Sequence, residues 1–90
     1  HTHLFLVGFA AETHDVLNKA RLKLVRKKLH MIAANQVGLP DRGFTSDDNA
    51  LTVLWEGGEQ TIPLASKTQI ARSLIELIGK RYSLYEENTT

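Results

Sequence analysis

The sequence predicts an α/β fold, and three patterns along the chain support this prediction. The first is a pair of apolar runs, at residues 4–7 and 31–34, with a helical pattern from about 13 to 28 between them, all within the length of one βαβ unit. The second is two short strand patterns that flank Gly57-Gly58, which is typical of a β-hairpin. The third is a long amphipathic pattern after Ser66. We therefore expect a Rossmann-like βαβ unit with a parallel core, extended by an antiparallel β-hairpin and a C-terminal helix.

Both strands of the βαβ unit are expected to be buried on two faces, because their apolar runs show no polar alternation. The first run is closed by Gly8 and the second ends at Asn35. Ligands of parallel sheets bind outside the carboxyl ends of the strands. We therefore expect the chemistry at residues 8–12 and 35–37.

The helix between these strands is expected to begin near Thr13, with Asp15 in its first turn, where an acidic side chain suits the helix dipole. Its apolar stripe is expected to comprise Val16, Leu17, Ala20 and Leu24. Beside the stripe runs a row of lysines four residues apart, Lys19, Lys23 and Lys27. Such a row can hold phosphates as point charges, although a solvated helix face is the more common meaning of this pattern.

The middle of the chain is predicted to be a loop followed by the hairpin. Residues 36–49 are rich in turn formers, and Phe44 is their one bulky apolar residue. Residues 50–56 alternate, with Leu51, Val53 and Trp55 on one face and Thr52 and Leu54 on the other. The next strand, at residues 60–64, contains Pro63, which cannot donate to a ladder and so favours an edge position.

The last helix is predicted to begin after Ser66, which together with Gln69 fits a capping box. We expect it to end near Tyr82. Its apolar face is expected to comprise Ile70, Leu74, Leu77 and Ile78, with Ala71 and Ile75 beside them.

Composition narrows the function classes for these 90 residues, which form one domain at most. Eleven basic and ten acidic residues give a net charge of +1, which disfavours a nucleic-acid partner. Without cysteine the chain has no disulfide and no thiolate metal site. No apolar run approaches the roughly 18 residues of a membrane span, and no signal peptide pattern is present. We therefore expect a cytoplasmic protein without a membrane partner.

Two polar patterns resemble parts of catalytic or metal sites. Glu12 with His14 is a possible acid/base pair, but two such residues at a strand-to-helix turn more often serve as helix-start polar groups. The cluster Asp47-Asp48-Asn49 resembles the start of a calcium loop but lacks the distal bidentate glutamate, so a turn is the better interpretation. The residues themselves identify no catalytic group and no metal site.

Five segments of the chain form a recognisable set. In chain order they are VGFAAET (7–13), ARLK (20–23), RKK (26–28), AAN (33–35) and GFTSDDNA (43–50). Together they closely resemble the C-terminal part of bacterial phosphopantothenate–cysteine ligase, the synthetase half of the bifunctional phosphopantothenoylcysteine decarboxylase/synthetase flavoprotein. The resemblance covers nearly the whole chain in the right order.

This resemblance implies a CTP-dependent ligase of coenzyme A biosynthesis. In that family, 4′-phosphopantothenate reacts with CTP to give an acyl-cytidylate and pyrophosphate, and cysteine then attacks the activated carboxyl group and releases CMP. Carried over residue by residue, the resemblance implies that Phe9, Lys23 and Lys27 contact CTP, and that Mg²⁺ accompanies the triphosphate. It assigns no catalytic residue here.

The resemblance also implies that residues 1–90 are a C-terminal subdomain, a fragment of the ligase domain whose upstream half supplies further nucleotide contacts. FMN is expected only in the decarboxylase domain, which lies outside these residues with its catalytic cysteine. A homodimer is expected, since ligases of this family are usually dimers. Gln36 stands where the family often has aspartate, so no role of that carboxylate is carried over. The alternative interpretation is a non-catalytic folding and dimerisation subdomain, whose hairpin supplies an edge for a partner strand.

Overall fold

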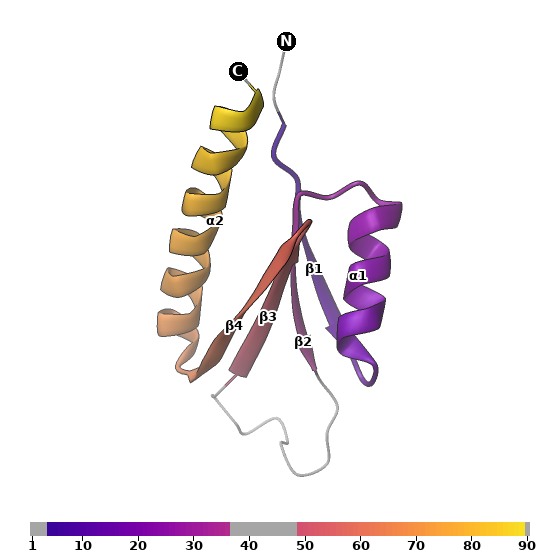
Figure 1. Ribbon diagram of the computed structural model, residues 1–90. Coiled ribbons are helices and arrows are strands. Elements are labelled where there is room, and N and C mark those ends of the chain that lie inside the picture. The colour runs from indigo at the N-terminus through magenta and orange to yellow at the C-terminus, as the bar shows by residue number, and fades with distance from the viewer. Residues whose placement is uncertain (1–3, 37–48, 90) are drawn as a thin grey trace.

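The computed structural model describes residues 4–36 and 49–89, which form one four-stranded sheet between two helices (Figure 1). The elements in chain order are β1 (Val7–Glu12), α1 (Val16–Arg26), β2 (Met31–Gln36), β3 (Asn49–Trp55), β4 (Gly58–Ala65) and α2 (Lys67–Thr89). The strand order is β1-β2-β3-β4; β1 and β2 are parallel, and the two following pairs are antiparallel. The predicted α/β class, parallel unit, hairpin and final helix are all confirmed. The predicted loop at residues 36–49, including Phe44, lies almost entirely outside the described residues.

The helices cover opposite faces of the sheet (Figure 1), so each face has its own apolar core. Under α1 the core comprises Ala10, Ala20, Leu24, Ile32, Ala34 and Leu54. Under α2 it comprises Met31, Ala33, Val53, Ile62, Ile70, Leu74 and Leu77. Successive residues of β2 contribute to alternate cores, which is why its apolar run shows no polar alternation. The predicted alternation in β3 is confirmed too, because Val53 lies under α2 and Leu54 under α1.

The first strand differs from its prediction. It begins at Val7 and continues to Glu12, whereas the apolar run at residues 4–7 predicted a strand that Gly8 closes. The reason is that β2 starts only at Met31, which pairs with Val7. The preceding Leu6 is bonded to the turn before β2 instead: its carbonyl accepts from the His30 N–H at 2.8 Å, and its own N–H donates to His30 Nδ1 at 2.9 Å. Since β1 lies at the sheet edge, it is not buried on both faces as predicted.

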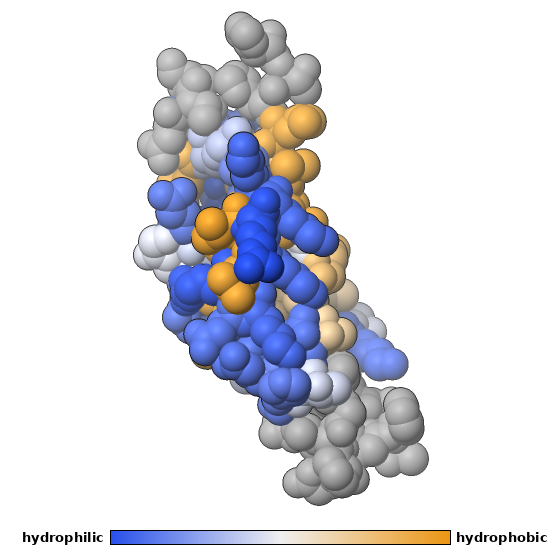
Figure 2. Space-filling view, turned by 90° about the vertical axis from the view of Figure 1, so that its right-hand side faces the viewer, coloured by the Kyte–Doolittle hydropathy of each residue, from blue (hydrophilic) through white to orange (hydrophobic). Residues whose placement is uncertain are grey.

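Helix α1 is shorter than predicted at both ends. It begins at Val16, because Asp15 adopts a left-handed conformation (φ 52°) and is the N-cap rather than a first-turn residue. Its carboxylate accepts a hydrogen bond from the Asn18 side chain at 2.9 Å and does not cap the backbone. In the predicted apolar stripe, Ala20 and Leu24 are buried but Leu17 is 45% exposed. Most of the outward side of α1 is hydrophilic (Figure 2).

The helix ends in a Schellman motif. The Leu29 N–H donates to the Leu24 carbonyl at 2.9 Å, and the Lys28 N–H donates to the Val25 carbonyl at 3.2 Å. Leu29 also packs against the core that contains Leu24, which is the apolar contact typical of this motif. Lys28 occupies the left-handed position (φ 54°), where glycine is the usual residue.

Lys28→Gly should therefore stabilise the chain by about 1 kcal/mol, because the Cβ penalty of the left-handed conformation disappears. Equilibrium urea unfolding of the two chains measures the difference. Arg26→Gly, at the last helical residue, is the matched control and should destabilise by about 0.5–1 kcal/mol. A loss of stability in Lys28→Gly would show that the left-handed conformation carries no such penalty.

The hairpin turn lies one residue earlier than predicted. Trp55 pairs with Gly58, so the turn is formed by Glu56 and Gly57 (φ 91°) rather than by Gly57-Gly58. Gly58 is needed for a different reason, because a Cβ there would lie 2.6 Å from the indole nitrogen of Trp55. Strand β4 is an edge strand, as Pro63 predicted, and Pro63 lies at a register irregularity where β4 carries one extra residue.

Helix α2 begins as predicted and ends later. The Gln69 N–H donates to Ser66 Oγ at 3.3 Å, but the helix continues past Tyr82 to Thr89. Its last turns are supported by aromatic contacts, because Tyr82 and Tyr85 pack against Phe5. Of the predicted apolar face, Ile70, Leu74 and Leu77 are buried, whereas Ala71 is exposed and Ile75 is 67% exposed. Among the described residues, neither helix has the length and apolar character that crossing a membrane requires.

Candidate functional site

A cluster of charged side chains lies where β1 ends. Glu12 is the last residue of β1 and is on the α1 side of the sheet. Its carboxylate accepts a hydrogen bond from Lys23 Nζ at 2.8 Å, and Lys19 Nζ lies 3.8 Å from the other carboxylate oxygen. The Glu12 side chain is only 15% exposed, against 35% for Lys19 and 40% for Lys23. The carboxylate is thus partly covered, and the two ammonium groups remain accessible to solvent.

These contacts lower the pKa of the Glu12 carboxyl below its ordinary value. The hydrogen bond from Lys23 is the largest cause; partial desolvation opposes it, and the charges of Lys23 and Lys19 add to it. Glu12 is therefore ionised throughout the neutral pH range. The cluster carries one negative and two positive charges that are held close together.

His14 belongs to the rim of this cluster. Its Nδ1 lies 3.1 Å from the Thr13 hydroxyl, and its Nε2 lies 3.3 Å from Lys19 Nζ. Within the described residues no hydrogen bond joins His14 to Glu12, so the structure does not form the possible acid/base pair of these two residues. The two side chains contact the same lysine instead.

The predicted row of lysines is not uniform. Lys19 and Lys23 converge on one carboxylate, whereas Lys27 is the C-cap of α1 and is exposed. Within residues 4–36 and 49–89, Lys27 forms no ion pair. No described side chain therefore occupies its ammonium group, whereas that of Lys23 is shared with Glu12.

Phe9 lies elsewhere than expected. It is the third residue of β1 rather than a residue beyond the strand's end, and it is 69% exposed. Because side chains alternate along a strand, Phe9 is on the α2 side of the sheet, with Val7, while Glu12 and its lysines are on the α1 side. The structure therefore brings Lys19 and Lys23 together and does not bring Phe9 to them. Only the free edge of β1 separates the two groups.

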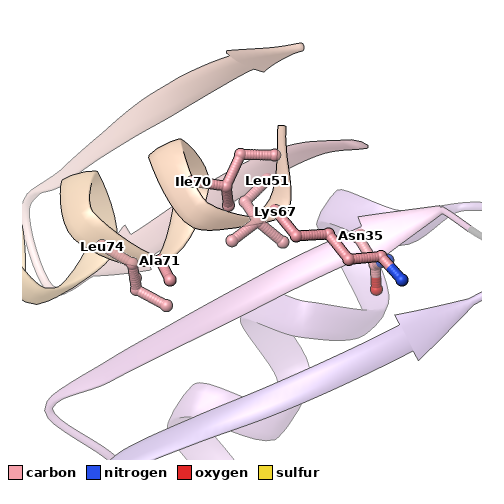
Figure 3. A pocket seen from close by; sticks show the side chains of 6 residues that line it. All are labelled: Asn35, Leu51, Lys67, Ile70, Ala71 and Leu74. Atoms are coloured by element: carbon pink, nitrogen blue, oxygen red, sulfur yellow. The ribbon is translucent and has the colours of Figure 1, made fainter. Parts of the chain in front are cut away.

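Further polar side chains lie at the end of β2, where ligands are expected. The Gln36 side chain donates to the Thr13 carbonyl at 3.1 Å and so ties the end of β2 to the segment after β1. Next to it, Asn35 and Lys67 border an open pocket of about 340 Å³ on the α2 side (Figure 3). The other lining residues are Leu51, Ile70, Ala71 and Leu74. Sequence reasoning did not identify Lys67, because it is far from Asn35 along the chain and carries no local motif.

The described residues offer no group of three or more histidine, cysteine, aspartate or glutamate side chains that could hold a metal ion. Asp47 and Asp48, which resembled part of a calcium loop, lie outside the described residues. The cluster at the end of β1 therefore consists of one carboxylate, two ammonium groups and an imidazole, and Phe9 lies apart from it.

Comparison with known proteins agrees with the resemblance. A family model described as "DNA/pantothenate metabolism flavoprotein C-terminal domain" matches residues 1–82. The Coenzyme A biosynthesis bifunctional protein CoaBC of Vibrio cholerae is 54% identical over 77 residues, which are 86% of this chain and 19% of that protein. The same protein of Escherichia coli K12 is 45% identical over 78 residues, and that of Bacillus subtilis is 39% identical over 75 residues.

A solved structure shows the same fold. It is the crystal structure of the C-terminal domain of Coenzyme A biosynthesis bifunctional protein CoaBC, with a TM-score of 0.68 and 32% sequence identity. The match covers 88% of this chain and 38% of that chain. The present chain thus spans less than half of that domain and about a fifth of the relatives' length.

Proposed function

The chain belongs to the family of DNA/pantothenate metabolism flavoprotein C-terminal domains, and from this premise we propose that it forms part of a CTP-dependent ligase that joins 4′-phosphopantothenate and cysteine. The relatives are named as bifunctional proteins of coenzyme A biosynthesis. The observation that carries the proposal is the pair of accessible ammonium groups on one side of α1, Lys23 and Lys27, of which Lys23 contacts the last residue of β1. Ammonium groups so placed suit a chain of phosphates.

Lys23 and Lys27 are proposed to contact the triphosphate of CTP. They are four residues apart on α1, which separates them by roughly 6 Å along the helix axis, so they reach different phosphates of one chain. The reaction places additional negative charge on pyrophosphate as it leaves. Positive groups fixed at that position stabilise this charge more in the transition state than in the ground state.

The position of Phe9 constrains how CTP lies. Phe9 and the two lysines are on opposite sides of an edge strand, so a ligand that contacts all three must lie along the free edge of β1. An exposed aromatic ring offers a flat apolar face to one part of the nucleotide while the lysines hold the phosphates. The opposite wall of such a site is proposed to come from the upstream half of the ligase domain.

The proposed reaction has two steps. A carboxylate oxygen of 4′-phosphopantothenate attacks the α-phosphorus of CTP, the bond to pyrophosphate breaks, and an acyl-cytidylate forms. The cysteine amino group then attacks the acyl carbon and CMP leaves. Mg²⁺ is proposed to accompany the triphosphate, whose oxygens suit this hard cation. FMN is proposed to act only in a decarboxylase domain outside this chain.

The alternative is a folding and dimerisation subdomain whose hairpin pairs with a partner strand. The structure makes the β4 edge poorly suited to this role, because Pro63 lacks a donor and lies at a register irregularity. Natural edge strands use both features to prevent pairing with other chains. We still propose a homodimer, but the β4 edge does not identify its interface.

The 90-residue chain alone should show no ligase activity, because activation of a carboxylate needs the substrate, the α-phosphate and the metal held in one place. This chain supplies side chains on two sides of one strand and corresponds to 19% of the Vibrio cholerae relative. Incubation of the pure chain with 4′-phosphopantothenate, cysteine, CTP and Mg²⁺ tests this, with CMP release as the readout. A full-length protein carrying these residues is the positive control, and release of CMP by the short chain would contradict the proposal.

A further inference from the structure

We propose that Glu12 is a positioning residue for CTP, which holds the Lys23 ammonium group in place for a phosphate before the ligand arrives. This inference rests on the proposed function, because it takes Lys23 as a phosphate contact. It adds a residue that neither the resemblance nor the family comparison assigns to the site.

The geometry around Glu12 supports a positioning role. Glu12 ends a strand whose register with β2 is fixed over six residue pairs, so its backbone is well anchored. Its carboxylate is largely covered, while the ammonium group of Lys23, which it contacts at 2.8 Å, is accessible. An ammonium group has three donors. One of them points to Glu12; within the described residues the other two have no hydrogen-bond partner, so they can donate to a phosphate.

Lys19 strengthens the arrangement. It contacts the second oxygen of the same carboxylate at 3.8 Å and reaches His14 Nε2 at 3.3 Å. Glu12 therefore bridges two ammonium groups that would otherwise repel each other. A lysine side chain has many rotamers, and a ligand that must order a free lysine binds less tightly than one that meets an ordered lysine.

A rival effect has the opposite sign, and this makes the proposal testable. Glu12 is itself an anion close to the proposed phosphate site, and its charge alone weakens the attraction of CTP. If this repulsion dominated, Glu12→Gln would bind CTP more tightly. If positioning dominates, the same substitution binds CTP less tightly, since Lys23 is no longer fixed by a charged partner.

The experiment compares Glu12→Gln, Lys23→Gln and the double variant in a full-length protein carrying these residues, by steady-state kinetics with varied CTP. We expect Glu12→Gln to lower kcat/KM for CTP about tenfold, which is in the range of couplings between contacting residues. The double variant should be close to Lys23→Gln alone, because Glu12 acts through Lys23. The KM for cysteine should not change, whereas a merely structural defect would lower the rate at every substrate concentration without this selectivity.

Glu59→Gln is the matched control. Glu59, in β4, forms an ion pair with Arg21 of α1 at 3.3 Å, and both side chains are about half exposed. Its removal should leave kcat/KM for CTP unchanged. Glu12→Asp keeps the charge but shortens the side chain, so its kcat/KM for CTP should lie between those of Glu12→Gln and the unmodified protein. It also serves as the test if Glu12→Gln does not fold.

The outcomes separate this inference from the proposed function. An unchanged kcat/KM in Lys23→Gln would overturn Lys23 as a phosphate contact and with it both proposals at this residue. A loss in Lys23→Gln with no loss, or a gain, in Glu12→Gln and Glu12→Asp would overturn the positioning role alone. Losses that simply multiply in the double variant would also overturn it.

Discussion

Lys23→Gln, in a full-length protein carrying these residues, should raise the KM for CTP about ten- to hundredfold, and Lys27→Gln should act in the same direction. A hydrogen bond to a charged partner contributes about 1.5–3 kcal/mol, which corresponds to this range. Glutamine keeps roughly the length of the side chain and has a helix propensity similar to that of lysine, so α1 should survive. If the contact tightens as pyrophosphate leaves, kcat falls as well.

The two variants differ in one respect. Lys27→Gln breaks no ion pair among the described residues, so its effect reports on the ligand alone. Lys23→Gln also leaves the Glu12 carboxylate, which is 15% exposed, without its closest partner. Lys28→Gln is the control, because Lys28 lies beyond the end of α1 in a left-handed conformation and has no proposed contact with CTP. Lys19 is unsuitable as a control, since it contacts Glu12. Equal and small effects of all three substitutions on KM would mean that the lysines form only a solvated helix face.

Phe9→Ala should weaken CTP binding about tenfold or more and leave the fold nearly as stable. Stacking of an aromatic side chain on a base contributes about 1–3 kcal/mol. A buried phenylalanine costs about 3–5 kcal/mol when it is truncated to alanine, but Phe9 is 69% exposed and contributes little to either core. Calorimetric titration of a full-length variant with CTP measures the affinity, and thermal unfolding of the 90-residue chain measures the stability.

Phe5→Ala is the matched control for Phe9→Ala. Phe5 is half-buried and packs against His30, Tyr82 and Tyr85, with ring centroids 5.2–5.6 Å apart. Its truncation should lower the melting temperature of the chain and leave CTP affinity unchanged in the folded protein. The opposite pattern, a large stability loss for Phe9→Ala with unchanged CTP affinity, would show that Phe9 is a structural residue.

Sequence patterns predicted the parts of the fold that depend on residues close together in the sequence. The continuous apolar run of β2 identified a strand buried on both faces, because each of its residues packs under one helix or the other. Alternation placed Val53 and Leu54 on the correct faces of β3. Ser66 and Pro63 marked the start of α2 and the edge position of β4, since Ser66 accepts from the nearby Gln69 N–H through its hydroxyl and Pro63 lacks an N–H of its own.

Features that depend on pairing between distant segments were not predictable in this way. The start of β1 is fixed by where β2 begins, so the apolar Leu4 and Leu6 precede the strand instead of forming it. The apolar run consequently predicted Phe9 at the carboxyl end of the strand, whereas Phe9 is the third residue of β1. The contact between Glu12 and Lys23 links the end of β1 to a residue of α1 eleven positions later in the sequence. Neither the two-residue period of a strand nor the 3.6-residue period of a helix predicts a contact between two different elements. Strand alternation counted from Val7 would have placed Glu12 on the α1 side.

The central claim is that this chain supplies the Phe9, Lys23 and Lys27 contacts to CTP. The most direct measurement is a crystal structure, with CTP and Mg²⁺, of a full-length protein carrying these residues. We predict phosphate oxygens within hydrogen-bond distance of the Nζ atoms of Lys23 and Lys27, with the nucleotide along the edge of β1 and in contact with the Phe9 ring. CTP bound with both ammonium groups in solvent and with Phe9 away from the nucleotide would contradict the claim.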